Sequence, residues 1–280
     1  MKRSLSGIQP SGILHIGNYF GAMKQFIDLQ DDYDGFYFIA DYHSLTSLTK
    51  AETLKENTYN IVLDYLAIGL DPNKSTIFLQ SNVPEHTELT WLLSNITPVG
   101  LLERGHSYKD KIAKGIPSNT GLLTYPVLMA ADILIYDSDI VPVGKDQKQH
   151  LEMTRDIAMK FNQQYEVEFF KLPEPLILDD SAIVPGTDGQ KMSKSYNNTI
   201  NMFATKKKLK EHSTPLEEPK NPDNNIAKIY ALFNNIDKQN ELKEKFLAGN
   251  FGYGHAKTEL LNSILEYFEK AREKREELEK

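Results

Sequence analysis

The 280-residue chain contains no cysteine. Its absence excludes disulfides, thiolate nucleophiles, iron–sulfur clusters and cysteine-based zinc sites. The 7 histidines are scattered along the chain, without the close spacing of a histidine metal site, so we expect no resident metal ion. A chain without disulfides suits a reducing compartment, and we expect a cytoplasmic protein.

Long hydrophobic runs and an excess of positive charge are also missing. The most apolar stretch, residues 126–135, is interrupted by Asp132 and is far shorter than the roughly 20 residues that span a bilayer. The first residues are basic, but the apolar segment of an export signal does not follow them. The formal net charge is −7, so contacts with a nucleic acid would have to come from local basic patches.

Strand-like apolar runs alternate with helical patterns over the first 160 or so residues. Continuous apolar strands are typical of strands covered on both faces, and strand–helix–strand order implies parallel pairing with right-handed crossovers. We therefore predict an open parallel α/β sheet with strands at 3–5, 36–40, 76–79 and 140–143, and helices at 15–29, 49–68, 85–96, 121–136 and 146–161.

The pattern changes near Pro173. Residues 173–199 are rich in proline, glycine, aspartate and serine, and every later periodic segment is helical. We predict an open α/β domain over residues 1–182 and a smaller all-helical domain over 183–280. The last segment, 256–280, predicts an amphipathic helix with a solvated, charged face.

A glycine-rich loop over residues 7–18 leaves the first predicted strand and begins the first helix. Ligands of open α/β sheets bind beyond the carboxyl ends of the strands, and a helix N-terminus attracts phosphate. His15 and Asn18 could donate hydrogen bonds to a nucleotide, and Gly17 would let a flat base approach closely. The loop matches neither the P-loop nor the dinucleotide fingerprint. A glycine-rich turn with a capping histidine remains the alternative.

A second loop, residues 186–195, has two lysines, Lys191 and Lys194, between glycines and hydroxyl groups. Lysines on a mobile loop can close over a triphosphate and stabilise the charge that builds on departing pyrophosphate. The alternative is an ordinary lysine- and serine-rich surface loop.

Asp132 falls on the apolar face of a predicted helix, together with Tyr125, Met129, Ile133 and Tyr136. A buried carboxylate needs a hydrogen-bond donor. An apolar slot with one buried acceptor suits an indole, which is flat, apolar and carries a single N–H donor. The alternative is a core aspartate bonded to backbone or to an arginine.

The segments His15-Ile16-Gly17-Asn18 and Lys191-Met192-Ser193-Lys194-Ser195 resemble the two signatures of class I aminoacyl-tRNA synthetases, in the family order. Residues 6–12, 121–126, 128–134 and 141–150 resemble the tryptophan branch of that class. The resemblance implies a Rossmann-like catalytic domain, ATP with Mg²⁺ on its phosphates, a tRNA acceptor, and a homodimer with helices 85–130 near the interface. It also implies a longer helical domain on the anticodon side than this chain has.

The resemblance implies three sets of functional residues, with Asp132 as the acceptor of the indole N–H. The catalytic set is His15, Lys191, Ser193, Lys194 and Ser195. The ATP set is Gln9, Ser11, His15, Gly17, Asn18, Lys111, Gly144, Asp146, Gln147, Ile183 and residues Lys191, Met192, Ser193, Lys194 and Ser195. The tryptophan set is Leu5, Gly7, Gln9, His43, Tyr125, Met129, Asp132, Ile133, Val141, Val143 and Gln147, of which Gln9, His43 and Gln147 would hold the ammonium and carboxylate.

The implied reaction activates L-tryptophan with ATP, releases pyrophosphate and transfers the amino acid to the 3′ end of its tRNA. The alternatives are a tyrosyl-tRNA synthetase-like enzyme, a small-molecule nucleotidyltransferase, and a non-catalytic paralogue that binds RNA or an amino acid. Two basic clusters could contact tRNA phosphates, and a solvated surface is the alternative for both; they are Arg104, Lys109, Lys111 and Lys114, and Lys206, Lys207, Lys208 and Lys210.

Overall fold

The computed structural model describes residues 1–46, 50–105, 108–109, 119–144, 147–177, 184–203, 221–249 and 251–280. The chain forms two compact units, each built from segments far apart in the sequence. The first unit contains Met1–Gly12, Ala22–Val62 and Leu70–Asp179, and the second contains Ile13–Gly21, Leu63–Gly69 and Asp180–Lys280. The expected division into domains at residues 1–182 and 183–280 remains a prediction.

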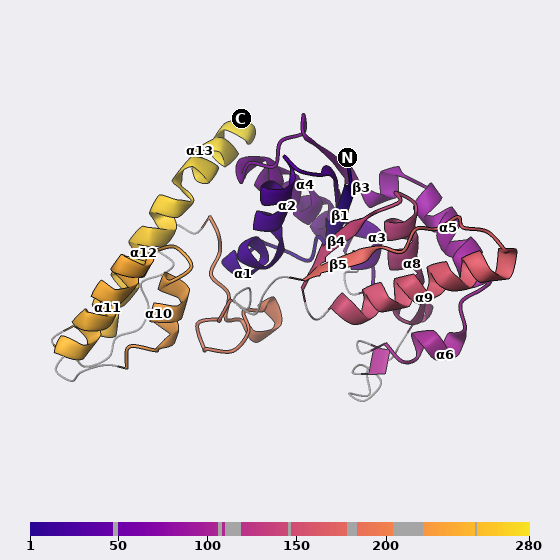
Figure 1. Cartoon of the computed structure of the whole chain (residues 1–280). Helices are drawn as coiled ribbons and strands as arrows, with labels where there is room; N and C mark the ends of the chain where they lie inside the picture. Colours follow the sequence, from indigo (N-terminus) through magenta and orange to yellow (C-terminus); the bar gives the residue numbers. More distant parts are fainter. Residues whose placement is uncertain are drawn as a thin grey trace. The chain divides into compact units, whose positions relative to one another are not determined.

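A parallel sheet of five strands organises the first unit (Figure 1). Every pair of neighbouring strands is parallel, which confirms the predicted open α/β sheet. The strand order reverses between the first and fourth strands, and ligands of such sheets bind at this point, beyond the carboxyl ends of the strands. In spatial order the strands are β3 (Ser75–Leu79), β2 (Asp34–Ile39), β1 (Arg3–Ile8), β4 (Ile140–Val143) and β5 (Glu174–Ile177).

Strand β5 was not predicted. It has only four residues, and it follows Pro173 and contains Pro175, so its sequence resembles a loop. It pairs with β4 at one edge of the sheet. A proline is tolerated in an edge strand because its missing N–H leaves no ladder bond unmade on the open side.

Helices α5, α8 and α9 pack together in the first unit around a core that includes Leu93, Val127 and Ile157. The α8 helix begins where the Asn119 side chain accepts a hydrogen bond from the Leu122 N–H at 2.8 Å, a typical N-cap. The helices of this unit are α2 (Lys24–Leu29), α3 (Asp41–Ser44), α5 (Glu85–Ser94), α6 (Val99–Leu102), α8 (Thr120–Leu134) and α9 (Lys148–Tyr165), with the 3₁₀ turn η2 (Gln80–Asn82), while α4 (Ala51–Ala67) contributes to both units.

Among its described residues, the second unit contains helices and isolated β-bridges. The predicted helix 15–29 is divided into α1 (Ile16–Asn18), a π-helical turn at Tyr19–Met23 and α2, which belongs to the first unit. The other helices of the second unit are the 3₁₀ turn η5 (Lys194–Tyr196), α10 (Asn225–Tyr230), α11 (Ile236–Ala248), α12 (Tyr253–Tyr267) and α13 (Glu269–Leu278) (Figure 1).

The predicted helix over 256–280 is two helices rather than one. It is interrupted at Phe268, whose side chain is buried and whose ring lies 4.9 Å from that of Tyr19. Packing of this aromatic residue against the chain's first helical segment overrides the continuous helical pattern. Among the described helices, none is both long and apolar enough to cross a bilayer.

Candidate active site

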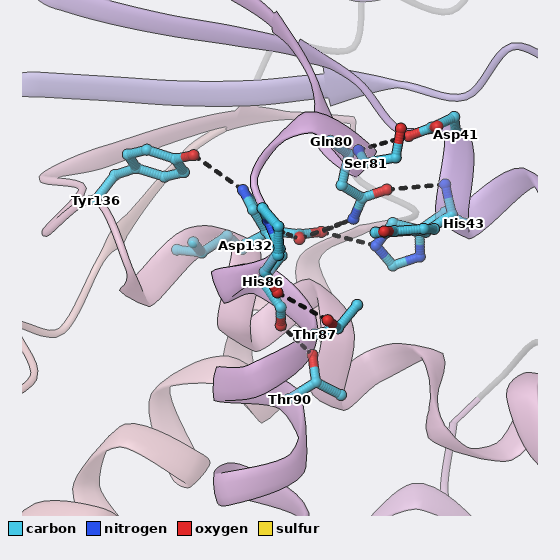
Figure 2. Close-up of polar contacts among 12 residues, drawn as sticks. Asp41, His43, Gln80, Ser81, His86, Thr87, Thr90, Asp132 and Tyr136 are labelled. Carbon is cyan, nitrogen blue, oxygen red and sulfur yellow. Dashed lines mark hydrogen bonds and ion pairs between the residues drawn. The ribbon is translucent and has the colours of Figure 1, made fainter.

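Asp132, on α8, is the centre of a buried polar cluster in the first unit, and only 1% of its surface is exposed. Its Oδ1 atom accepts hydrogen bonds from Gln80 Nε2 at 2.8 Å and His86 Nδ1 at 2.6 Å. Its Oδ2 atom accepts from His43 Nε2 at 2.8 Å and from Gln80 Nε2 at 3.0 Å. Figure 2 shows the three donor side chains around this carboxylate.

The three donors come together because they follow neighbouring strands or begin a helix. His43 lies in α3, directly after β2, and Gln80 lies in η2, directly after β3. Parallel strands end at the same edge of a sheet, so both residues reach the same place. Gln80 is fixed in turn, because its Oε1 atom accepts the Tyr42 N–H at 3.1 Å and its amide N–H groups are thereby directed at Asp132.

The electrostatics of the cluster keep Asp132 ionised. Burial would raise the pKa of Asp132, but hydrogen bonds from His43 and His86 outweigh it and lower the pKa below its usual value. A carboxylate offers about four lone-pair sites. Three donor atoms of the protein make four contacts with Asp132, because Gln80 Nε2 bonds to both oxygens.

His86 links Asp132 to Tyr136. The Nε2 atom of His86 lies 2.9 Å from the Tyr136 hydroxyl, and the imidazole ring is fully buried. Burial and the negative charge of Asp132 raise the pKa of Tyr136 to about 12. Sequence reasoning missed the role of His86 and of Gln80. A histidine in the first turn of a helix has no distinctive spacing, and their convergence on Asp132 depends on the sheet.

The apolar residues predicted to form the indole slot lie in one cluster of the first unit. Leu5, Ile133 and Val141 are buried in it, and Met129 and Val143 pack against it. A second feature of the predicted slot is that Gly7 lies against a ring of the same cluster. A Cβ atom at that position would lie 2.6 Å from the Phe38 ring, so only glycine fits there.

Tyr125 and Gln147, both predicted to contact the amino acid, are joined through His150. The Tyr125 hydroxyl lies 2.5 Å from His150 Nε2, and His150 Nδ1 lies 3.1 Å from Gln147 Oε1. A cavity of about 350 Å³ is lined by residues including His43, Tyr125 and Asn119. The structure therefore places two of the predicted tryptophan-binding side chains, His43 and Tyr125, on the walls of one cavity.

The first signature loop lies in the second unit. The backbone N–H of His15 donates to Asn18 Oδ1 at 3.1 Å. The His15 side chain is 6% exposed, and its Nδ1 atom is buried without a hydrogen-bond partner among the described residues. Burial, with the positive charge of Lys194, lowers the pKa of His15 to about 4, so the imidazole is neutral near pH 7. A Cβ atom at Gly17 would lie 2.8 Å from His15 Nδ1, which explains the glycine.

The second signature loop is a short hairpin held by Asn198. Pro185 and Lys191 form an antiparallel bridge, and Asn198 Nδ2 donates to the Lys191 carbonyl at 3.1 Å while its Oδ1 accepts the Ser193 N–H at 2.7 Å. A Cβ atom at Gly186 would overlap the Asn198 side chain. Asn198 is buried and was not predicted. It organises the loop that carries both lysines.

The two signature segments meet within the second unit. His15 forms an antiparallel bridge with Asn201, and the Ile16 N–H donates to the Ile200 carbonyl at 3.0 Å. The two residues contacted, Ile200 and Asn201, closely follow Asn198, which holds the second signature loop. Burial lowers the pKa of Lys194, and the charge of Asp64 opposes that shift. These backbone contacts bring the two signature segments side by side.

Asp64, on α4, is almost completely buried and pairs with Arg275 of α13. Arg275 Nε lies 2.7 Å from Asp64 Oδ1. The guanidinium also lies over the Phe203 ring, 5.5 Å from its centroid. The charged face of the last helix was predicted to be solvated. This prediction is wrong for Arg275, because its guanidinium pairs with the buried carboxylate of Asp64 on α4.

Residues 2–269 match the family described as "tRNA synthetases class I (W and Y)". The chain belongs to this family. Known members are similar over nearly the whole chain. A tryptophan–tRNA ligase of Fusobacterium nucleatum is 94% identical over an alignment that covers 100% of this chain and 88% of that relative. A tryptophan–tRNA ligase of Rhodopirellula baltica is 54% identical, with 99% and 89% covered.

A solved structure of a class I synthetase is also similar. The tryptophanyl-tRNA synthetase of Campylobacter jejuni, crystallised with ADP and tryptophan, is 52% identical with a TM-score of 0.91, covering 99% of this chain and 89% of that chain. This similarity confirms the predicted Rossmann-like class I fold.

The structure describes only some of the remaining predicted residues of this class I synthetase. Gln9 and Ser11 lie exposed in the loop after β1, Gly144 directly follows β4, and Met192 is buried. Of the basic residues, Arg104 and Lys109 are exposed. Lys111, Asp146, Ile183, the side chain of Ser195, and the basic residues Lys114, Lys206, Lys207, Lys208 and Lys210 lie outside the part of the chain that the structure describes.

Proposed function

We propose that the chain is a tryptophan–tRNA ligase, which forms tryptophanyl-adenylate from L-tryptophan and ATP and then transfers tryptophan to the 3′ end of its tRNA. The single observation that carries this function is the crystallised relative from C. jejuni, which holds tryptophan and ADP in a chain of the same fold. The buried Asp132 and the paired signature loops supply matching chemistry here. A tyrosyl-tRNA synthetase-like enzyme is the alternative that the test must exclude.

In the tryptophan pocket, Asp132 accepts the indole N–H in place of His43. Among its three donors, Gln80 and His86 have 0% exposed surface, whereas His43 borders the cavity. His43 is therefore the donor that can turn away without breaking the buried cluster. Its imidazole is then available to the substrate carboxylate, while Gln9 and Gln147 hold the ammonium group.

In the nucleotide site, the signature loops bind ATP, with Mg²⁺ carried in on the phosphates as part of the substrate. The Nδ1 atom of His15 has no hydrogen-bond partner in the described part of the chain, so this buried imidazole can bond to a ligand. Lys191 and Lys194 stabilise the charge that grows on the leaving pyrophosphate, which is electrostatic catalysis. A carboxylate is already a nucleophile at neutral pH, so alignment and charge stabilisation suffice without a covalent enzyme intermediate.

Amino-acid-dependent ATP–pyrophosphate exchange, screened over all twenty amino acids, tests this function. We expect exchange with tryptophan and at least about 10⁴-fold less with tyrosine or phenylalanine, the range for sites built around a substrate hydrogen-bond donor. Equal exchange with tyrosine would support the tyrosyl alternative. Exchange with none of the twenty, together with binding of tRNA, would support a non-catalytic paralogue.

We further propose that the ligase is a cytoplasmic homodimer that uses the surface of α5. Trp91, the only tryptophan of the chain, is 71% exposed there, next to the exposed Leu92. Large exposed apolar side chains on one helix are typical of a protein–protein interface. Trp91→Glu should convert the dimer to a monomer in light scattering, with Lys160→Glu at an exposed position of α9 as a control. An unchanged mass for Trp91→Glu would move the interface elsewhere.

A further inference from the structure

The two oxygens of the Asp132 carboxylate have different histidine partners, of which only one borders the cavity. Its Oδ2 atom is bonded to His43, which borders the cavity, whereas its Oδ1 atom is bonded to His86, which is fully buried. Free rotation of the carboxylate would exchange the two oxygens and blur this distinction. A donor that is hydrogen-bonded to Oδ1 prevents this rotation. It therefore fixes which oxygen meets a substrate and at which angle.

For a neutral imidazole at His86, the hydrogen-bond chain has one direction. Ionised Asp132 accepts only, so the Nδ1 atom of His86 must carry a proton and donate to Oδ1 at 2.6 Å. The Nε2 atom then accepts from the Tyr136 hydroxyl at 2.9 Å. Such chains polarise one another and fix the tautomer of the central ring.

We propose that His86, with its Nε2 atom held by Tyr136, is a positioning residue that holds Asp132 Oδ1 so that Oδ2 meets the indole N–H. This inference rests on the proposed function. His86 does not touch the substrate. It acts through Asp132, and its contribution is selectivity for a side chain that donates at this position rather than catalysis of the chemical step.

Two further contacts keep His86 itself in place. Its backbone carbonyl accepts the Thr90 hydroxyl at 2.6 Å, and its ring is tilted against those of Phe38 and Phe78, with centroids 6.1 Å apart in each case. A ring that is packed on its faces and bonded at both nitrogens cannot turn without losing both hydrogen bonds. The carboxylate is therefore supported by a rigid neighbour.

The experiment compares two substitutions that each keep a hydrogen-bonding group near one of the two imidazole nitrogens. His86→Asn places an amide N–H near the position of Nδ1 and so keeps the donor to Asp132. His86→Gln reaches the Nε2 position and loses that donor. The readout is the ratio of kcat/KM for tryptophan to that for its benzothiophene analogue, in which sulfur replaces the indole N–H.

We expect His86→Gln to lower this ratio by about 10- to 100-fold, the range for a lost hydrogen bond to a charged group. The loss should fall on the KM for tryptophan and leave kcat at saturation nearly unchanged. His86→Asn should keep the ratio within about threefold of that of the unmodified protein, because the donor to Oδ1 is retained. A ratio that is unchanged in His86→Gln, or lowered equally in both variants, would overturn the proposal.

Tyr136→Phe removes one oxygen atom and provides a variant that should fold even if the His86 variants do not. We expect it to lower the ratio by about fivefold, the range for a neutral hydrogen bond. In a His86→Asn background it should have no further effect, because the shorter amide side chain no longer reaches Tyr136. A Tyr136→Phe effect that persists in that background, or is absent in the native one, would contradict action through His86.

Calorimetric binding of tryptophan and of the benzothiophene analogue to the same variants measures the ratio without turnover. Binding and exchange together therefore test the ligase activity and the role of His86 separately. Tryptophan-selective binding without exchange would contradict the proposed ligase activity while still deciding the role of His86. Exchange with an undisturbed preference for tryptophan in His86→Gln and Tyr136→Phe would contradict the role of His86 alone.

Discussion

The Asp132 cluster and the signature-loop site differ in how far their own residues satisfy them. At Asp132, protein donors occupy both carboxylate oxygens and hold them in place. At the signature loops, His15 has a buried nitrogen without a partner among the described residues, and burial lowers the pKa of Lys194. The first arrangement is stable without a ligand. The second has a buried nitrogen and a desolvated cation that a bound ligand would stabilise.

This difference indicates two ways of obtaining specificity and rate. A preorganised acceptor discriminates between substrates because only a substrate with the right donor can replace the His43 hydrogen bond. A cationic, incompletely solvated loop binds most strongly where negative charge develops, which is how it accelerates a reaction. We therefore expect substitutions at the first site to change selectivity and substitutions at the second to change rate.

The largest expected effect is on selectivity, from Asp132→Ala. Without the carboxylate, the preference for tryptophan over phenylalanine and tyrosine should fall by up to about 10⁴-fold in exchange assays. Asp156→Ala, which removes an exposed carboxylate of α9 in the same unit, is the control. If Asp132→Ala does not fold, Asp132→Asn serves. Unchanged selectivity in a folded variant would place the indole acceptor elsewhere.

The next largest effect is on rate, from Lys194→Ala. Removing one preorganised charge donor should slow adenylate formation by about 10²- to 10³-fold in pre-steady-state assays. Selectivity among amino acids should not change. Lys243→Ala, at an exposed position of α11 in the same unit, is the matched control. A loss of less than about threefold for Lys194→Ala would contradict both the catalytic role of Lys194 and the expected difference between the two sites.

A third effect is on stability, from Arg275→Ala. The substitution leaves Asp64 buried without its ion-pair partner, and should lower the free energy of unfolding by about 3 kcal/mol. Adding Asp64→Asn should restore part of that loss, because the uncompensated charge disappears. Lys274→Ala breaks an exposed pair with Glu277 on the same helix, and should cost less than about 1 kcal/mol. Equal losses for the two single variants would contradict a buried pair.

The smallest effect is the pH dependence that His15 contributes. Its pKa is about 4 in the folded chain and about 6.5 when unfolded. Below pH 6.5 the unfolded state therefore binds a proton that the folded state does not, so folding stability falls as pH drops toward 4. The penalty at pH 5 should be on the order of 2 kcal/mol. In urea titrations, His15→Gln should lose less stability than the native chain between pH 7 and pH 5. Parallel losses would show that the His15 ring is solvated.

Much of the fold could be predicted from the sequence because apolar runs and helical periods are local properties. Four of the strands were found in this way, whereas the two signature loops were found from their glycine and lysine patterns and their resemblance to a known family. Strand β5 could not be, since Pro173 and Pro175 make its four residues resemble a loop and only pairing with β4 defines it. The break at Phe268 likewise depends on packing against Tyr19.

The site was predicted unevenly for a related reason. Asp132 stood out because a carboxylate on an apolar helix face is costly and so carries a signal in one sequence. Gln80, His86 and Asn198 carry no such signal. A buried amide or imidazole can be paired in many ways, and its partner is fixed only once distant strands and loops have been placed.

The sequence by itself determined the class of fold, the two signature loops and the need for a buried acceptor at Asp132, because periodicity, glycine placement and the cost of burying charge act on neighbouring residues. Only the tertiary structure decided which side chains complete that acceptor, that Asn198 holds the lysine loop, and that Arg275 compensates Asp64. The contacts of Asn198 with Asp188 and of Arg275 with Asp64 join residues 10 and 211 positions apart, and no local rule relates such positions.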